Sequence, residues 1–460
     1  MSASPLSAPE PALTRLQHMR ALLVLGLPLV GSHLAQMALH VTDTVMLGRY
    51  GVNELAAVVL GAGLFFVVFI LGSGFGIGVM GVVAGALGSG DETQVRRATR
   101  MGLWLSILYG VLVFPVMWFA GPVFRGLGQE AVVAQLAQDY LRIAGLGMVP
   151  ALVIMVLKSH LAANERTQVV FWVTLAAVGL NIALNWLLIF GNWGMPELGV
   201  RGAALASFAV QMFSALALAG YAAWVPALRH FNLFQRFWRP DWQAFGQIFR
   251  IGWPIGLTGL AEGGLFQASA LMMGWLGTMQ LAAHGIALEI TALAFMIHLG
   301  LSNAATVRAG RADGAGDLQR LRDGAAMAIL LSLLIVALVI VLFFAIPEAL
   351  VGLFLDPAEP QAPEIIAFGA RLLAVAALFQ LFDAMQAMAL GLLRGVQDTR
   401  VPMWLAGISY WVVGIPVSYL LAFPLGFGGL GLWLGLSIGL AMASVLLMLR
   451  FWRGLARRAA

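Results

Sequence analysis

Twelve long runs of apolar residues make up most of this chain, and only short polar segments separate them. About 20 apolar residues are needed to cross the hydrocarbon core of a bilayer, where each backbone polar group must be satisfied within a helix or a closed barrel. The alternating segments typical of a membrane β-barrel are absent. The runs therefore predict twelve membrane-spanning helices, centred near residues 32, 67, 108, 144, 178, 211, 261, 293, 332, 377, 412 and 442.

The basic residues predict the orientation of these helices. With the N-terminus in the cytoplasm, seven cytoplasmic segments hold 21 of the 26 Lys and Arg residues, as the positive-inside rule requires. We therefore expect both termini, and a segment containing Lys158, to be cytoplasmic. Because the charges are spread over separate loops, the pI of about 10.1 does not indicate nucleic-acid binding. Five basic residues fall on or near the predicted outer side and are exceptions to this rule: Arg49, Arg125, Arg142, Arg201 and Arg371.

The chain also contains an internal repeat at an offset of 226 residues. Gly26–Pro28 recurs as Gly252–Pro254, and Leu55–Ala57 recurs as Leu281–Ala283. Each copy holds six apolar runs, and an even number returns the chain to the side where it began. The fold class predicted is thus an all-α polytopic membrane protein, with two six-helix lobes related by a pseudo-two-fold axis along the membrane normal.

This repeat divides the chain into a cytoplasmic tail (1–14), an N-lobe (15–225), a cytoplasmic linker (226–247) and a C-lobe (248–460) that ends in a short basic tail. The linker mixes basic and aromatic residues, a composition typical of a segment that contacts lipid at the membrane interface. The tail lacks the basic start of a cleaved signal, so we expect the first span to be retained. The expected location is a bacterial inner membrane.

The sequence excludes ATP hydrolysis as the energy source. The chain has a single lysine, and no P-loop glycine pattern precedes it. A dinucleotide-type glycine pattern lies within an apolar helix with no strand before it. Its glycines and their neighbours are better explained by close packing of helices, so an ion gradient remains as the energy source. The glycines concerned are Gly74, Gly78, Gly81 and Gly85.

Four acidic residues lie within predicted spans: Asp43, Glu262, Glu289 and Asp383. Intramembrane acids are costly and usually functional, and an unpaired carboxylate there must take up a proton or hold a cation. Glycines flank Glu262, and amides lie near Asp383, which would let an ion approach. We therefore predict that Glu262, Asp383 and Glu289 couple transport to a cation, although a structural role for Glu289 is equally open. No cofactor or other metal is expected.

Asp43 ends a polar stripe whose other members are His33, Gln36 and His40. Their spacings of 3, 4 and 3 residues place all four on one helix face, which must point into the protein rather than into lipid. We predict that Asp43, Gln36 and His40 form a substrate or proton site in the N-lobe. A structural hydrogen-bond seam is the alternative. A metal site is not favoured, because no further ligand cluster accompanies the two histidines.

The following segments share one pattern: Gly26–Pro28, Ala35–Gln36, Asp43–Met46 and Leu55–Ala57, then Gly252–Pro254 through Ala304–Arg308, and finally Phe382–Ala384, Leu393–Gly395 and Asp398–Arg400. Together they resemble one known family, the multidrug and toxic compound extrusion (MATE) transporters. The resemblance covers about residues 15 to 455. Within the family, the presence of an acid at both Glu262 and Asp383 resembles the pattern of the NorM-type branch. An amide would be expected at Glu289 in that branch.

The resemblance implies a two-lobed antiporter that exports lipophilic, mostly cationic drugs or dyes in exchange for sodium ions or protons. It implies an N-lobe acid at Asp43 and cation-binding acids at Glu262 and Asp383. No obligate protein partner and no enzymatic activity are expected. A flippase for lipid-linked precursors remains an alternative, but a phosphate-bearing substrate would need a basic cavity. An intramembrane enzyme using His33 and His40 would lack a paired nucleophile, and ion-driven uptake stays open.

Overall fold

The computed structural model describes residues 14–356 and 360–459, which form helices joined by short connections and contain no strand. Four short helices lie in the connections: α4 (Ala120–Gly126), η2 (Asn192–Gly194), α9 (Pro226–Arg229) and α13 (Pro347–Gly352). The long segments are α1 (Arg15–Tyr50), α2 (Val52–Gly88), α3 (Glu92–Trp118), α5 (Ala131–Ala144) with η1 (Gly145–Gly147) and α6 (Met148–Ala163), α7 (Thr167–Leu188), α8 (Val200–Trp224), α10 (Trp242–Leu276), α11 (Thr278–Gly314), α12 (Leu318–Ala345), α14 (Ala362–Gly395), α15 (Arg400–Gly407) with η3 (Ile408–Gly414) and α16 (Ile415–Ala422), and α17 (Gly428–Ala459).

These segments correspond to the twelve predicted spans. Within the described residues, 11 are long and apolar enough to cross a membrane by length and composition alone. The twelfth, α10, is more polar. Its 35 residues pack along α2, in the position that the repeat predicts for the C-lobe counterpart of α1. At 1.5 Å per residue, α10 is about 52 Å long, more than a hydrocarbon core requires. The chain is therefore a multi-pass membrane protein with two lobes of six spans.

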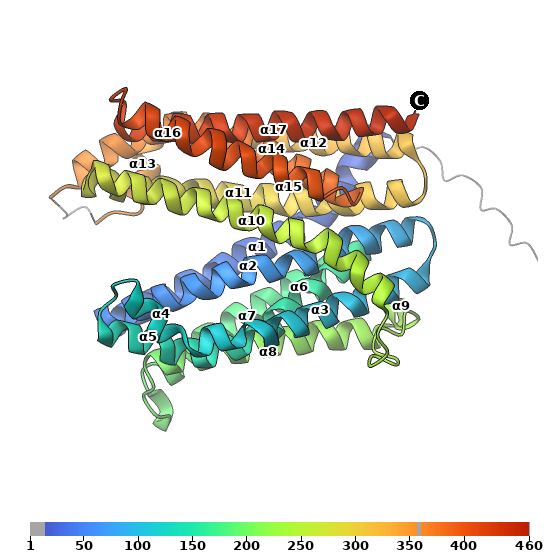
Figure 1. The fold of residues 1–460 in the computed structure, drawn as a ribbon, viewed down its shortest axis with the longest axis horizontal. Helices are drawn as coiled ribbons and strands as arrows, with labels where there is room; N and C mark the ends of the chain where they lie inside the picture. Colours follow the sequence, from blue (N-terminus) through green and yellow to red (C-terminus); the bar gives the residue numbers. More distant parts are fainter. Residues whose placement is uncertain (1–13, 357–359, 460) are drawn as a thin grey trace, which may run out of the picture.

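The two lobes form separate bundles that converge at one end (Figure 1). Helices α1 to α8 make the N-lobe and α10 to α17 make the C-lobe, and the lobes meet where α1 and α2 pack against α10 and α11. The bundles diverge toward the end that carries α4, α5 and α13. We call the converging end, where α9 and the connection to α10 lie, the linker end, and the diverging end the far end.

Aspartate residues start three helices at the linker end. Asp91, Asp241 and Asp317 precede α3, α10 and α12, and each accepts a hydrogen bond from the backbone N–H three residues later, at 2.9, 3.1 and 2.8 Å. Such caps satisfy one of the free N–H groups of the first turn. Asp241 also pairs with the Arg97 guanidinium, which is the main reason that the pKa of this carboxyl lies below its usual value. This pair joins the first turn of the C-lobe to α3 of the N-lobe.

Glycines allow the lobes to touch along α2. A Cβ atom added to Gly74 would lie 2.3 Å from the carbonyl oxygen of Gly252 on α10. One added to Gly314 on α11 would lie 1.9 Å from the carbonyl oxygen of Gly85. Both distances are far inside van der Waals contact, so only glycine fits. The helix packing predicted from the glycine spacing is confirmed, and it joins the two lobes. We call these four residues the glycine seam.

Side-chain hydrogen bonds reinforce the contact between the lobes. They are Gln94 Nε2 to Gln247 Oε1 at 2.8 Å, Arg311 Nη2 to the carbonyl oxygen of Ala163 at 2.7 Å, Arg311 Nη1 to Glu165 Oε1 at 2.8 Å, and a bond between Asn303 Nδ2 and His33 Nε2 at 3.1 Å. With the glycine seam, these bonds hold the lobes together at the linker end and at mid-height. This conformation is therefore closed toward the linker end.

Two sequence-based boundaries differ from the structure in detail. Helix α10 begins at Trp242, so the end of the predicted linker (226–247) belongs to this helix. Lys158, expected in a cytoplasmic segment, lies inside α6 with only 7% of its surface exposed. The lysine thus belongs to a helix and not to a connection between helices, because α6 continues past it to Ala163. Residues 1–13 of the predicted tail lie outside the described residues.

We predict that Gly74→Leu opens the linker end, because the new side chain must displace the α10 backbone. Gly63→Leu is the matched control, since a Cβ atom at Gly63, also on α2, meets nothing within 4 Å. The chain has no cysteine. A Gln94→Cys and Gln247→Cys pair therefore reports closure by disulfide cross-linking without background. We expect Gly74→Leu to lower cross-linking severalfold and Gly63→Leu to leave it unchanged. Equal cross-linking in both variants would contradict this account of the seam.

Candidate functional site

The C-lobe brings Glu262 and Asp383 together, as the sequence predicted. Glu262 lies on α10 and Asp383 on α14, and their carboxylates are within electrostatic range of each other. Gln386, nearly one turn after Asp383, donates from Nε2 to Glu262 Oε1 at 3.0 Å. Asp383 is only 3% exposed. Two carboxylates in one low-dielectric site repel each other, so the site needs positive charge.

Polar atoms without protein partners gather around this pair. Within the described part of the chain, enclosed atoms that lack a hydrogen bond include both amide atoms of Gln380, Asp383 Oδ1, Gln386 Oε1 and the Tyr410 hydroxyl. Buried polar groups are normally hydrogen-bonded, so several unsatisfied ones in one place mark a site that binds something. We call Glu262, Gln380, Asp383, Gln386 and Tyr410 the C-lobe cluster. Its oxygen atoms suit a hard cation or a proton.

Tyr410 enters the cluster from an unusual helical segment. It lies in η3 (Ile408–Gly414), a π-helical stretch that interrupts span 11 between α15 and α16. Such stretches are rare and are frequent at functional sites. The next residue, Trp411, donates from Nε1 to the carbonyl oxygen of Ala261 at 3.1 Å and so ties η3 to α10 beside Glu262. The sequence-based interpretation missed Tyr410, because no local residue pattern identifies a π-helix.

A basic side chain also reaches this region. Arg394, in the last turn of α14, lies within electrostatic range of Glu262 and Tyr410. The sequence analysis treated the intramembrane acids as unpaired, so the position of Arg394 near Glu262 was not predicted. Long side chains on a helix generally lean toward its N-terminus, which is the direction of the cluster from Arg394. One guanidinium offsets one carboxylate, so the pair keeps about one negative charge for a mobile ion.

Glu289 does not join the C-lobe cluster. It lies on α11 with its side chain exposed. His284, five residues earlier, is fully buried and accepts a hydrogen bond from Trp433 Nε1 at 3.0 Å, which shows that the two residues occupy different faces of the helix. The predicted third acid is therefore not part of the site that Glu262 and Asp383 form.

In the N-lobe, Asp43 is held by neutral donors from two neighbouring helices. Asp43 Oδ1 accepts from Asn181 Nδ2 at 3.0 Å and from Asn185 Nδ2 at 2.6 Å, both on α7. Its Oδ2 accepts from the Ser207 hydroxyl of α8 at 3.4 Å. We call these four residues the N-lobe cluster. Because the donors carry no charge, an ionised Asp43 would still attract a cation.

The amides of the N-lobe cluster were missed from sequence, although a signal exists. Asn181 and Asn185 are four residues apart on an otherwise apolar helix and therefore share a face. Of the predicted stripe, Gln36 is half-buried, and His40 is exposed but within electrostatic range of Asp43. His33 instead binds Asn303 of the C-lobe. The far-end part of the stripe therefore lies with the N-lobe cluster, whereas His33, at mid-height, contacts the C-lobe.

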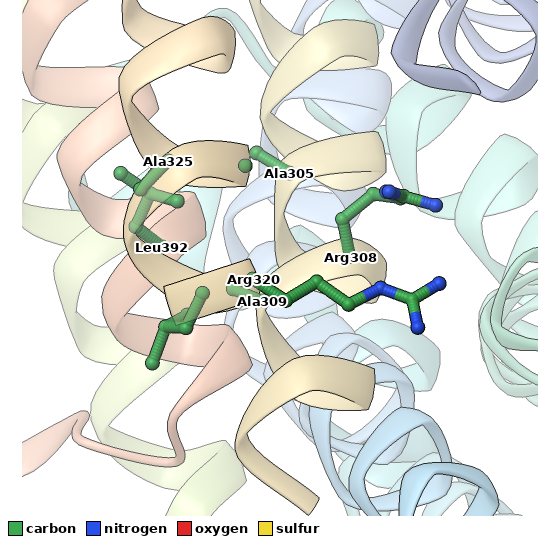
Figure 2. A pocket seen from close by; sticks show the side chains of 8 residues that line it. Ala305, Arg308, Ala309, Arg320, Ala325 and Leu392 are labelled. Atoms are coloured by element: carbon green, nitrogen blue, oxygen red, sulfur yellow. The ribbon is translucent and has the colours of Figure 1, made fainter. Parts of the chain in front are cut away.

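A small pocket at the linker end of the C-lobe lies apart from both clusters. It is bounded by α11, α12 and α14, and Figure 2 shows the Arg308 and Arg320 side chains extending to the same side. It contains none of the acids discussed above. Among the described residues there is also no group of three or more His, Asp or Glu side chains that could hold a metal ion.

The architecture is that of a membrane protein built from two homologous six-helix lobes, each with a carboxylate cluster in its interior. The MatE family model matches residues 28–187 and 254–420, one match per lobe and in the register of the repeat. The chain belongs to the MatE family. It is similar to proteins called "Probable multidrug resistance protein NorM" in Rhizobium meliloti (48% identity, 96% of this chain and 94% of that one) and in Agrobacterium fabrum (46% identity, 94% and 93%).

Solved structures with low sequence identity share the fold. One is described as the outward-facing conformation of a multidrug resistance MATE family transporter of the MOP superfamily, with a TM-score of 0.86, 22% identity, and coverage of 98% of this chain and 100% of that one. Another is the eukaryotic MATE transporter AtDTX14, with a TM-score of 0.82, 21% identity, and coverage of 97% and 98%. The predicted twelve-helix, two-lobed fold is thus confirmed.

We predict that Asp43 and Asn185 stabilise the protein as a coupled pair. Removing one partner of a charge-assisted hydrogen bond costs about 1.5–3 kcal/mol. Unfolding of purified Asp43→Asn, Asn185→Leu and the double variant should give a coupling free energy above about 1 kcal/mol. Asn192 binds only the carbonyl oxygen of Trp186 at an exposed site, so Asn192→Leu should show no coupling to Asp43→Asn. Additive effects at Asn185 would contradict the predicted coupling.

Proposed function

We propose that this protein is a secondary multidrug efflux transporter that exchanges lipophilic, mostly cationic compounds for sodium ions or protons by alternating access. The observation that carries the proposal is the pair formed by half-buried Glu262 and buried Asp383, with its unsatisfied polar neighbours. The names of the NorM relatives support drug export. Transport moves the substrate across the membrane without breaking a covalent bond, so no enzymatic step is proposed.

The C-lobe cluster is the proposed coupling site. Glu262 and Asp383 repel each other unless a cation or a proton lies between them, while Arg394 offsets only part of their charge. Binding and release of that ion therefore changes the net charge of the C-lobe interior. A change of that kind is able to favour one arrangement of the lobes over another, because the ion stabilises the arrangement that binds it better.

The two arrangements differ in which end of the lobe interface is open. We assign the linker end to the cytoplasm, because the basic segments of the sequence favour that side. Both termini are then cytoplasmic, in a bacterial inner membrane. With contacts at the linker end, the present conformation corresponds to the outward-facing form, which agrees with its similarity to a structure described by that name. The opposite arrangement requires the glycine seam and the polar contacts to separate.

The N-lobe cluster is the proposed site for the cationic part of the substrate. Asp43 is bound only by neutral donors, so a positively charged drug would find an uncompensated carboxylate there. Aromatic side chains on α2 of the same lobe, such as Phe65 and Phe69, which stack at 6.3 Å, would favour flat lipophilic cations. A flippase for phosphate-bearing lipids is disfavoured, because acids rather than bases occupy both clusters.

We predict that Asp383→Asn and Glu262→Gln abolish drug export and cation binding, since each removes a charge from the coupling pair. Glu289→Gln is the matched control, because it makes the same chemical change at an exposed site of the same lobe. Dye efflux from cells should fall by at least about tenfold in the first two variants and remain near wild type in the third. Cation binding, measured by stabilisation of the purified protein in sodium or by proton uptake, should follow the same pattern.

This proposal fails if well-expressed Asp383→Asn protein retains full efflux, or if Glu262→Gln leaves cation binding unchanged. A loss of efflux in Glu289→Gln equal to that in Asp383→Asn would place the coupling site elsewhere. Loss of folded protein in the two buried variants, checked by size-exclusion chromatography, would assign them a structural role.

We further predict that Asp43→Asn impairs export of cationic substrates more than export of neutral ones. The reason is that the amide keeps a polar group at the site but removes the attraction for positive charge. Transport of a cationic and an uncharged dye would be compared in vesicles, with cation binding measured in parallel. Equal losses for both dyes, or loss of cation binding, would place Asp43 in the coupling site or in a structural seam.

A further inference from the structure

Two helices end at the linker end in turns of the same geometry. The turns follow α6 and α14, each of which completes the fourth span of its lobe. In each turn, one backbone N–H donates to the carbonyl oxygen three residues earlier, and the next N–H donates to the one five residues earlier. The bonds are Glu165 to Ala162 at 2.9 Å, Arg166 to Leu161 at 2.8 Å, Gln397 to Arg394 at 3.1 Å and Asp398 to Leu393 at 2.9 Å. This helix-ending motif usually has glycine at its left-handed position.

Glu165 and Gln397 occupy that left-handed position, with φ of 59° and 60°. Helices α2 and α11 end in the same motif at the same end of the molecule, but there the residues are Gly90 and Gly316, with φ of 72° and 70°. The left-handed conformation is unfavourable for a residue with a Cβ atom. Glycine would therefore suit all four turns, and the side chains of Glu165 and Gln397 need an explanation beyond ending a helix.

Both side chains cross to the opposite lobe. Glu165 of the N-lobe accepts from Arg311 Nη1 of α11 at 2.8 Å, and the same guanidinium donates to the carbonyl oxygen of Ala163 at 2.7 Å. Gln397 of the C-lobe lies against α2, with its Nε2 atom 3.3 Å from the place that a Cβ atom of Gly85 would occupy. Arg311 and Gly85 are 226 residues apart, which is the offset of the repeat. The two contacts are therefore equivalent under the pseudo-two-fold axis.

Gln397 also belongs to a chain of amides that crosses the lobe interface. Its Oε1 accepts from Gln247 Nε2 of α10 at 3.4 Å, and Gln247 Oε1 accepts from Gln94 Nε2 of α3 at 2.8 Å. Opening of the linker end moves α2 and α3 of the N-lobe away from the turn after α14. These contacts, like the one between Glu165 and Arg311, exist only while the linker end is closed.

The turn that holds Gln397 is joined directly to the C-lobe cluster. It follows α14, which carries Asp383, and Arg394 in the last turn of α14 lies within electrostatic range of Glu262. The Arg394 carbonyl oxygen accepts from Gln397 N–H and also contacts α2, since a Cβ atom at Gly81 would lie 2.3 Å from it. A cation bound by the two acids would weaken their attraction for Arg394, because it neutralises the same carboxylates. The end of α14 would then be held less firmly.

We propose that Glu165 and Gln397 form a paired latch that keeps the linker end closed, and that the Gln397 half releases when the C-lobe cluster takes up its ion. The Glu165 half ends a helix that carries no member of this cluster, so it holds in both ion states. With the linker end in the cytoplasm, ion uptake from outside would favour opening toward the inside, which is the order that antiport requires. This inference rests on the proposed transport function and names residues that regulate it.

The test measures the distance between spin labels at Thr93 and Gln319, which are exposed residues at the linker ends of α3 and α12. The chain has no cysteine, so Thr93→Cys and Gln319→Cys carry the only labels. Double electron–electron resonance on the full-length protein in lipid nanodiscs gives the ratio of open to closed molecules. Each variant is measured in sodium chloride and in choline chloride, and at acid and alkaline pH.

Gln397→Gly and Glu165→Gly should each raise the ratio of open to closed molecules by about threefold or more, because contacts specific to the closed form are lost. Asn232→Gly is the matched control. Asn232 is also left-handed, with φ of 48°, but its side chain donates to the carbonyl oxygen of His230 within the linker itself. This variant relieves the same backbone conformation and should leave the ratio unchanged.

A second variant covers a failure of Gln397→Gly to fold. Asn tolerates the left-handed conformation, but its side chain is one methylene shorter than that of Gln. Gln397→Asn should therefore open the linker end as Gln397→Gly does, whereas Gln397→Glu keeps the oxygen that accepts from Gln247 and should remain closed.

The two halves of the latch should differ in their response to the ion. In the wild type and in Glu165→Gly, the ion that binds the C-lobe cluster should raise the open fraction, whereas Gln397→Gly should abolish this response. Equal ratios in Gln397→Gly and Asn232→Gly would overturn the latch. No ion response in the wild type, or a full response in Gln397→Gly, would overturn its link to the cluster.

Dye efflux from vesicles separates this inference from the transport function. Ion-dependent opening that requires Gln397, without ion-driven efflux, would contradict the transporter proposal and support the latch. Ion-driven efflux by a protein whose linker end opens equally in the wild type and in Gln397→Gly would contradict the latch and leave the transporter proposal intact.

Discussion

The repulsion between two carboxylates enclosed in one membrane-embedded lobe is the constraint on which the proposed mechanism depends. Glu262 and Asp383 come from helices α10 and α14 and lie within electrostatic range of each other, with Asp383 buried and Glu262 half-buried. Such a pair is stable only with a positive charge nearby, and Arg394 offers one that is fixed. A second, mobile charge is what a gradient supplies. Ion binding and lobe arrangement are then linked, because the ion stabilises one arrangement more than the other.

The internal repeat gives the two lobes one fold but different chemistry. In the register of the repeat, Glu262 of the C-lobe corresponds to Gln36 of the N-lobe, and Asp43 corresponds to Ser269. The acids therefore occupy different heights on equivalent helices. Asp43 is surrounded by neutral amides, whereas Glu262 faces a second acid. We interpret this difference as a division of labour, with the ion in the C-lobe and the cationic end of the substrate in the N-lobe.

Much of this arrangement was predictable from sequence. Apolar runs of sufficient length identified all twelve spans, and the 226-residue repeat gives independent support for α10, which is more polar than the other spans. The acids Glu262 and Asp383 were found because charge within a span is rare. The face on which Glu289 lies was not predicted, since an unbroken apolar helix has no clear periodicity to orient it. Tyr410 was missed because a π-helical stretch depends on packing around η3 rather than on local residue types.

Charges at the linker end were harder to place. Lys158 and Arg394 follow long apolar runs, as residues at a membrane surface do, yet both belong to helices that extend further and carry these side chains into the protein. Long basic side chains reach several ångströms along a helix, so sequence position alone does not locate their charge. The amide pair Asn181 and Asn185 was readable from its four-residue spacing, and it supplies donors to the acid that the sequence did identify.

The central claim is that an ion gradient alone drives drug movement through this protein. The direct measurement uses sealed vesicles that contain the purified protein and a fluorescent lipophilic cation at equal concentrations inside and outside. Sodium and pH gradients are imposed separately, with the membrane potential clamped. Our account predicts that at least one of these gradients moves the dye in the direction opposite to the ion flow, so that the dye accumulates on the side from which the ion comes. It also predicts that a dye gradient in turn moves the same ion. Dye movement that is indifferent to both gradients would contradict it.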